Sequence, residues 1–130
     1  SESVGEALQG TSVAISADGN TAIVGGNRDN NGQGAVWVYT WNGSNWIQQG
    51  NKLVGTGNVG AAFQGTFASI SADGNTIIEI GNQDDNTGAA WVFTRNNGIW
   101  TQQGSKLEGT DDTGVGDLGV SQSVLMAILQ

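Results

Sequence analysis

Short runs of β-branched and aromatic residues, separated by Asp, Asn and Gly, recur along the chain and predict an all-β protein. Asp18-Gly19-Asn20 and Asn42-Gly43 predict tight hairpin turns, because Asp, Asn and Gly tolerate the positive φ angles that such turns require. No helix is expected, since Gly interrupts every stretch that has a 3.6-residue period. The four strands expected first along the chain span residues 11–16, 21–25, 35–41 and 46–53.

The same pattern occurs twice. Residues 9–21 return at 64–76, and both copies end in Ser-Ala-Asp-Gly-Asn-Thr. The segment Gly-Ala-Val-Trp-Val-Tyr-Thr at 34–40 returns as Gly-Ala-Ala-Trp-Val-Phe-Thr at 88–94. The repeat is therefore about 55 residues long, a period that is typical of repeat architectures. It divides the chain into a first repeat at 1–58, a second at 59–113 and an out-of-pattern remainder at 114–130.

The repeat length predicts how the sheets are arranged. A single four-stranded sheet cannot bury both of its faces, so neighbouring repeats are expected to stack. Four strands in a repeat of this length are typical of a β-propeller blade. A propeller needs roughly 4–8 blades, whereas this chain supplies about 2.4. We therefore expect an all-β chain of four-stranded antiparallel blades whose ring is completed by oligomerisation, or a chain that is a fragment of a longer protein.

Four segments of the first repeat resemble the FG-GAP repeats of bacterial surface and secreted proteins, which are related to the propeller of the integrin α-subunit. The resemblance implies an integrin-like propeller of seven blades, secreted or on the cell surface, used for adhesion or ligand recognition without catalysis. The family's Phe-Gly is matched only loosely by Phe63-Gln64-Gly65, its Gly-Ala-Pro element has no Pro here, and Glu79 interrupts an apolar strand. The segments that carry the resemblance lie at 12–16, 18–25, 34–40 and 46–53.

Composition narrows the range of functions. The 130 residues include no Cys, His or Pro, so thiolate nucleophiles, disulfides and imidazole bases are excluded and an enzyme is not expected. Twelve acidic against four basic side chains give a net charge of −8, which argues against nucleic acid as a partner. No apolar run approaches the roughly 20 residues of a membrane span, so none is expected.

The remainder at 114–130 is expected to be an incomplete third repeat. One permitted set of codons for residues 119–130, read two bases later, encodes Ser-Val-Ala-Ile-Ser-Ala-Asp-Gly-Asn-Thr-Ala, which is identical to residues 12–22. Our hypothesis is that a frameshift near Leu118 replaced the third repeat, and the nucleotide sequence of this segment tests it. The shift leaves a new apolar run at 124–129, which needs a neighbour to bury it.

A loop in each repeat has the spacing of a calcium site. Residues 27–32 place side-chain oxygens at alternate positions followed by Gly, an arrangement that suits calcium. The alternative is a polar turn loop, because neither repeat has an acid at the later bidentate position. The candidate ligands are Asn27, Asp29 and Asn31 in the first repeat and Asn82, Asp84 and Asn86 in the second.

The tryptophans divide into two groups. Trp37 and Trp91 alternate with small or β-branched residues, which indicates packing between sheets. Three others, Trp41, Trp46 and Trp100, flank the hairpin turns and are candidates for contact with a glycan or a protein. The alternative is that these three form aromatic pairs across the strands of their hairpins.

These features predict a binding or adhesion scaffold that associates with itself as a homo-oligomer. Three copies would supply six blades through heterologous, closing interfaces, which makes a trimer one expected form. If the same interface does not close, the copies form a head-to-tail filament, and a structural β-rich polymer is the first alternative. A lectin-like glycan binder is the second alternative.

Overall fold

The computed structural model describes residues 4–108, which form two four-stranded antiparallel sheets. The predicted all-β class is confirmed, whereas the remainder at 114–130 lies outside the described residues. The first sheet has the order β1-β2-β3-β4, with strands at Gln9–Ile15, Thr21–Gly26, Ala35–Trp41 and Trp46–Gln48. The second has the order β5-β6-β7-β8, with strands at Phe67–Ile70, Thr76–Gly81, Ala89–Asn96 and Ile99–Gln102.

Two details of the predicted elements are wrong. A single helical turn, α1 (Asp29–Gly32), follows β2, and a 3-10 turn, η1 (Asp84–Asn86), follows β6. Both lie in the loops that were expected to be irregular, and left-handed residues such as Asn30 and Asp85 interrupt them. Such turns are too short to have a helical period that the sequence could reveal.

Strand β4 is shorter than predicted, because it ends at Gln48 rather than at residue 53. Gly50 has a φ of 71°, in the left-handed region, and takes the chain out of the strand. The chain then returns to β3, where Leu53 and Val36 exchange two backbone hydrogen bonds of 2.7 and 3.0 Å. Leu107 and Ala90 make the same exchange in the second repeat, so the departure and return are a feature of the repeat.

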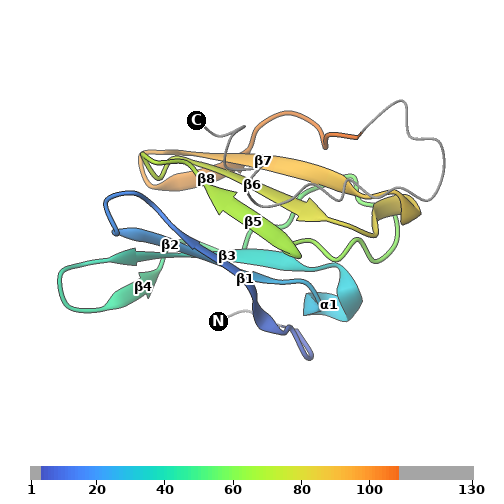
Figure 1. The fold of residues 1–130 in the computed structure, drawn as a ribbon, viewed down its shortest axis with the longest axis horizontal. Coiled ribbons are helices and arrows are strands. Elements are labelled where there is room, and N and C mark those ends of the chain that lie inside the picture. The colour runs from blue at the N-terminus through green and yellow to red at the C-terminus, as the bar shows by residue number, and fades with distance from the viewer. Residues whose placement is uncertain (1–3, 109–130) are drawn as a thin grey trace.

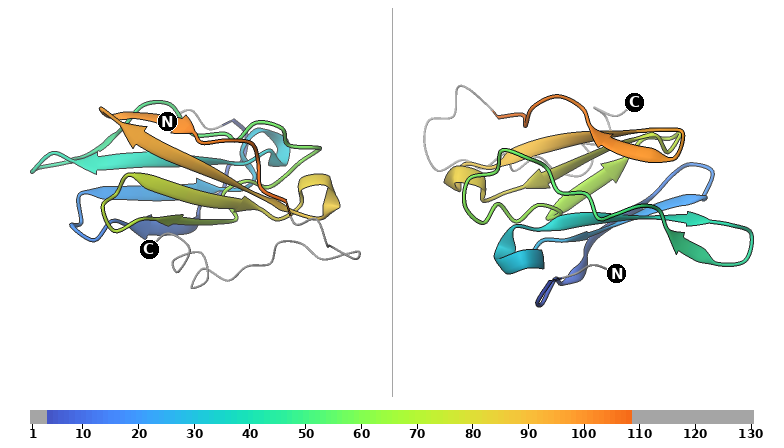
Figure 2. Two further views of the ribbon diagram at one scale, coloured as in Figure 1. Left: turned by 90° about the horizontal axis from the view of Figure 1, so that it is seen from above. Right: turned by 180° about the vertical axis from the view of Figure 1, so that it is seen from behind.

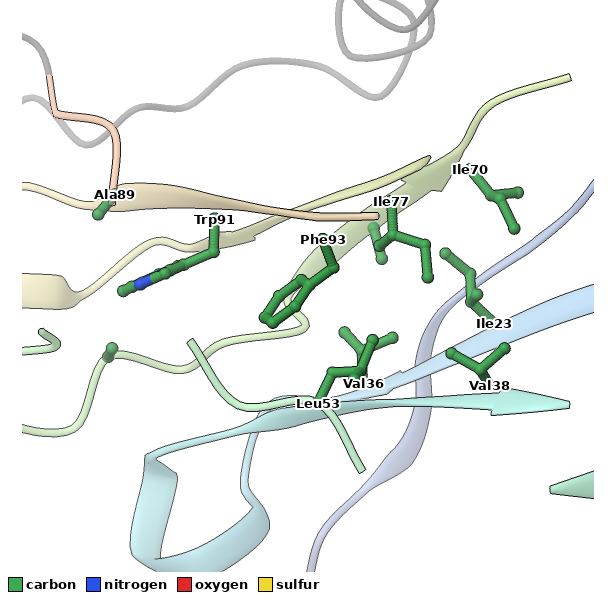
Figure 3. Close-up of a cluster of buried hydrophobic side chains, with 11 residues drawn as sticks. Ile23, Val36, Val38, Leu53, Ile70, Ile77, Ala89, Trp91 and Phe93 are labelled. Atoms are coloured by element: carbon green, nitrogen blue, oxygen red, sulfur yellow. The ribbon is translucent and has the colours of Figure 1, made fainter. Parts of the chain in front are cut away.

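The two sheets lie face to face, with β5 of the second against β1 and β2 of the first (Figures 1 and 2). Side chains from both sheets fill the space between them. Figure 3 shows Ile23, Val36 and Val38 pointing towards Ile77 and Phe93, and all five are buried. Apolar burial at about 25 cal/mol per Å² makes this shared core the main source of stability.

The strand registers define two faces on each sheet. The inner face of the first sheet carries Ile23 and Val38, and its opposite face, the outer face, carries Val13 paired with Val24. The second sheet meets the first with residues that correspond in the repeat to this outer face: Ile77 corresponds to Ala22, for example. The two repeats therefore stack in the same sense. The inner face of the first sheet packs against the face of the second sheet that corresponds, in the repeat, to the first sheet's outer face.

The sheets approach most closely at β1, β2 and the start of β5. Ser12 Oγ donates a hydrogen bond of 2.9 Å to the carbonyl of Gly65. A Cβ atom on Gly25 would lie 2.2 Å from that same carbonyl oxygen. At the other side of the interface Trp91 and Phe93 occupy the space. Small residues at one edge and large ones at the other give the interface the form of a wedge.

Candidate functional site

The acidic residue of each candidate calcium loop is held by a lysine of its own repeat. Asp29 is completely buried, accepts a hydrogen bond of 2.6 Å from the Val4 N–H, and pairs with Lys52 Nζ at 2.7 Å. In the second repeat Asp84 is equally buried and pairs with Lys106 Nζ at 2.6 Å. Each carboxylate is therefore fully engaged in a buried ion pair, which ties the loop to the chain after the fourth strand.

The other candidate ligands contact different groups. Asn27 lies between two threonines, accepting from Thr11 Oγ1 and donating to Thr66 Oγ1, both at 3.2 Å. Asn31 is exposed with a left-handed φ of 59°, and Asn82 Oδ1 is buried without a hydrogen-bond partner. Asn86 is the last residue of η1. Within residues 4–108 no three acidic side chains gather into a possible metal site.

This arrangement does not fit a calcium site in the form that the loop spacing suggests. A cation at Asp29 would have to displace the Lys52 ammonium, which already neutralises the carboxylate. The two lysines are not among the residues predicted from the sequence, although a signal for them exists. Both repeats place a lysine 22 or 23 residues after the buried aspartate, in the shared Gln-Gln-Gly-x-Lys-Leu segment. Calcium binding stays a prediction.

Replacing Lys52 by Met tests the ion pair. The change leaves a buried carboxylate without its counter-charge, so we expect a loss of about 3–5 kcal/mol in the free energy of unfolding, measured with urea. Asp29→Asn combined with Lys52→Met removes both charges and should recover most of that loss. The Lys106→Met variant of the second repeat is the matched control and should behave alike. A loss below 1 kcal/mol in both lysine variants would show that the pairs contribute little.

The exposed tryptophans form a pair across a hairpin. Trp41 at the end of β3 faces Trp46 at the start of β4, with ring centroids 5.5 Å apart and planes tilted by 53°. Both remain partly open to solvent, at 40% and 44% exposure. The aromatic pairing expected as one alternative is present here, and the pair still offers open ring surface to a ligand.

Trp100, the counterpart of Trp46, has a different environment. Arg95 replaces Trp41 in the second repeat, and its guanidinium lies 5.0 Å from the Trp100 ring centroid. The Trp100 indole N–H donates to Gln49 Oε1 at 2.9 Å, and Arg95 donates to the same oxygen at 3.0 Å. Arg95 also donates to Thr21 Oγ1 at 3.2 Å. Trp100 thus helps to join the two sheets, unlike Trp46.

The outer face of the first sheet is an apolar surface. Val13 and Ile15 on β1 are 60% and 56% exposed. Across the strands they pair with Val24 and Ala22, and the next pairing places Tyr39 on the same face. Trp41 and Trp46 continue this face by register. Contiguous exposed apolar surface of this kind marks an interaction site more often than a free surface.

Glu79 is a buried carboxyl group between the two sheets. It lies on β6 opposite Trp91, where the first repeat has Val24, and its side chain is inaccessible to solvent. Oε2 accepts a hydrogen bond of 2.7 Å from the Gly65 N–H, whereas Oε1 has no partner. Burial raises the pKa of Glu79 from 4.5 to about 8, although the Gly65 hydrogen bond opposes the shift.

Asp18 and Asp73, by contrast, belong to the turns. The pKa of Asp18 is lowered by the backbone N–H of Asn20 and by the Ser16 hydroxyl, which both donate to its carboxylate. The pKa of Asp73 is lowered in the same way by Ser71 and Asn75. This geometry confirms that both aspartates are turn residues, as the Asp-Gly-Asn sequence indicates.

No family model matches the chain, and a search of curated proteins found no match to its sequence. Neither of the helical turns in the described part of the chain has the length or apolar character to cross a membrane.

The raised pKa of Glu79 predicts a stability that falls with rising pH. The folded chain keeps a proton on Glu79 that the unfolded chain releases above pH 4.5, so the contribution of Glu79 to stability is greatest below that pH. Between pH 4.5 and about 8 the free energy of unfolding should fall by up to about 1.4 kcal/mol per pH unit. Urea unfolding of wild type and Glu79→Gln measures the effect as a difference. Parallel pH profiles for the two proteins would contradict it.

Proposed function

We propose that this chain is a non-catalytic binding or adhesion scaffold whose two sheets act as β-propeller blades of the FG-GAP type. Copies of the chain associate to extend the stack that the two repeats begin. The observation that carries this proposal is the same-sense stacking of the repeats. The face of the second sheet that carries Ile77 is buried against the first sheet. The corresponding face of the first sheet leaves Val13 and Ile15 exposed.

The shape of the interface supports a stack that curves. Gly25 on β2 and Gly65 just before β5 allow close approach, while Trp91 and Phe93 occupy the space between the sheets further out. Sheets packed with such a wedge rotate about an axis near their first strands, as the blades of a propeller do. The resemblance to FG-GAP repeats supports the same arrangement, together with a secreted or cell-surface location.

An open stack is the alternative assembly. Phe67 and Ile80 on the outer face of the second sheet stand where the first repeat has Ser12 and Gly25. Ile80 is already buried within the chain, and these larger side chains would hold a neighbouring copy further away at the edge where the internal interface is narrowest. If the resulting rotation does not close a ring, the same heterologous contact gives a filament.

A glycan ligand is favoured by one specific observation, the exposed Trp41–Trp46 pair. Aromatic rings with open faces are suitable platforms for sugar rings. A glycan array with the wild type and with Trp46→Ala tests this role. Trp100→Ala is the comparison, because Trp100 is engaged by Arg95 and Gln49.

The mass of the native protein tests the proposed assembly. We expect multiples of the 13.3 kDa chain mass by sedimentation, with a trimer if three copies close a ring. Salt should favour the assembly, because each chain carries a charge of −8 and salt screens the repulsion between copies. A mass that grows with concentration, with fibres in negative-stain microscopy, indicates the filament. A cooperatively unfolding monomer at every concentration would overturn self-association.

A further inference from the structure

A pocket of about 390 Å³ opens where the loops of the two repeats meet. The segment before β1 and the β2–β3 loop line it from the first repeat, and Phe63, in the segment before β5, lines it from the second. Figure 1 shows α1 and the turn after β6 at the same end of the two sheets, opposite the β3–β4 hairpin. The volume lies in the range of small-molecule sites, roughly 300–1,000 Å³.

Contacts with the first repeat hold Phe63 in place. Its N–H donates to the carbonyl of Gly32 at 2.7 Å, and its carbonyl accepts from Thr66 Oγ1 at 2.6 Å. Phe63 has a φ of 60°, a left-handed conformation that a bulky residue adopts only where its surroundings require it. A Cβ atom on Gly32 would lie 2.6 Å from Phe63 Cε1, so the ring needs glycine there. The pocket is therefore formed before any ligand arrives.

Arg28 is the basic residue of the pocket, and its side chain is exposed. Arg28 Cζ lies 5.7 Å from the centroid of the Phe63 ring, which is a cation–π contact. Within residues 4–108 the guanidinium makes no ion pair or hydrogen bond, so its N–H donors are free to bind a ligand. The other basic side chains each bond to an acidic or polar group: Lys52, Arg95 and Lys106.

Two other polar side chains line the pocket, Glu6 and Asn31, and both are exposed. Glu6 makes no ion pair with Arg28 in the described part of the chain. A guanidinium binds a carboxylate through paired hydrogen bonds. The Glu6 carboxylate accepts hydrogen bonds from hydroxyl groups and repels a second negative charge. The ligand that suits these groups together has a single carboxylate with hydroxyl groups beside it.

We propose that this pocket binds a carboxylate-bearing sugar ring, such as a uronic acid residue of an acidic glycan. Arg28 binds the carboxylate, Glu6 and Asn31 bind hydroxyl groups, and the C–H groups of the ring contact Leu8 and Phe63. Leu8 also lines the pocket and is 55% exposed. The inference rests on the binding role proposed above. It needs no association between copies, because every residue of the pocket belongs to one chain.

The second repeat has a neighbouring pocket that serves as a comparison. Phe63 lines this pocket as well, so the two lie on either side of one ring. Gln83 stands where the first repeat has Arg28, and Asp85 adds a negative charge. The net charge of −8 disfavours anions over most of the chain. A carboxylate is therefore expected at Arg28 and not in the second pocket.

An NMR titration with the methyl glycoside of galacturonic acid tests the site. We expect shifts in the amide signals of Asn31 and Gly32, with little change at Gln83 and Asp85. A single sugar ring should bind with a Kd of about 1 mM. The methyl ester of the same sugar is the matched control. It lacks the charge that Arg28 recognises and should bind about tenfold more weakly.

Substitutions in the pocket give a second test. Arg28→Gln introduces the residue of the second repeat and should raise Kd about tenfold. Arg28→Lys keeps the charge but loses the paired geometry, so it should raise Kd about threefold. Ser44→Asp, in the exposed β3–β4 hairpin, changes the net charge as Arg28→Gln does and should leave Kd unchanged. Glu6→Gln removes the repulsion and should let inorganic phosphate bind, which the wild type should exclude.

The outcomes separate this site from the proposed assembly. Equal binding of the acid and its ester by the wild type would overturn the site, and this comparison does not depend on how well a variant folds. A tetraglutamate peptide that binds at Arg28 more tightly than the sugar would overturn the glycan as the ligand. Sedimentation of the same samples measures self-association. Oligomers that bind no sugar overturn the pocket alone, whereas a monomer that binds the sugar supports the pocket and overturns the assembly.

Discussion

The structure depends on one constraint: a four-stranded sheet has two faces, and within residues 4–108 the only other elements of a repeat are helical turns of three or four residues. The chain meets this constraint by placing the second sheet on the inner face of the first. Ile23 and Val38 are buried because Ile77 and Phe93, which belong to the next repeat, pack against them. The folding unit is therefore the pair of repeats, and of its two outward faces the one on the first sheet leaves Val13 and Ile15 exposed.

Within each repeat, electrostatics act locally and hold the loops in place. The buried pairs of Asp29 with Lys52 and Asp84 with Lys106 connect the turn after the second strand to the chain beyond the fourth. Each aspartate also binds a backbone N–H at the start of its repeat, from Val4 or Val59. Three separate parts of a repeat thus meet at one carboxylate. The loop whose sequence has the spacing of a cation site is therefore joined to two other parts of its repeat through a buried aspartate.

Much of the fold follows from local patterns, and the rest depends on contacts that a sequence shows poorly. The Asp18 turn is predictable, because an aspartate bonds to an N–H only two residues away. Strand alternation is likewise a local pattern, and together with the repeat period it predicts the two sheets. The Asp29–Lys52 pair spans 23 residues, and no local pattern connects its members. Glu79 is visible as an anomaly in an apolar strand, but its burial depends on a sheet contributed by the other repeat.

The inner face of the second sheet and the corresponding outer face of the first sheet differ in sequence. The difference distinguishes the interface inside the chain from the open face. Glu79 and Arg95 lie on the inner face of the second sheet, where the outer face of the first has Val24 and Trp41. The Arg95 guanidinium is satisfied by Thr21 and Gln49, which the first sheet presents only on its inner side. A charged group matched in this way costs little in the correct pairing and a great deal in a wrong one. The internal junction is therefore specified by polar groups, whereas the outer face keeps the plain apolar surface from which the repeat's own packing is built.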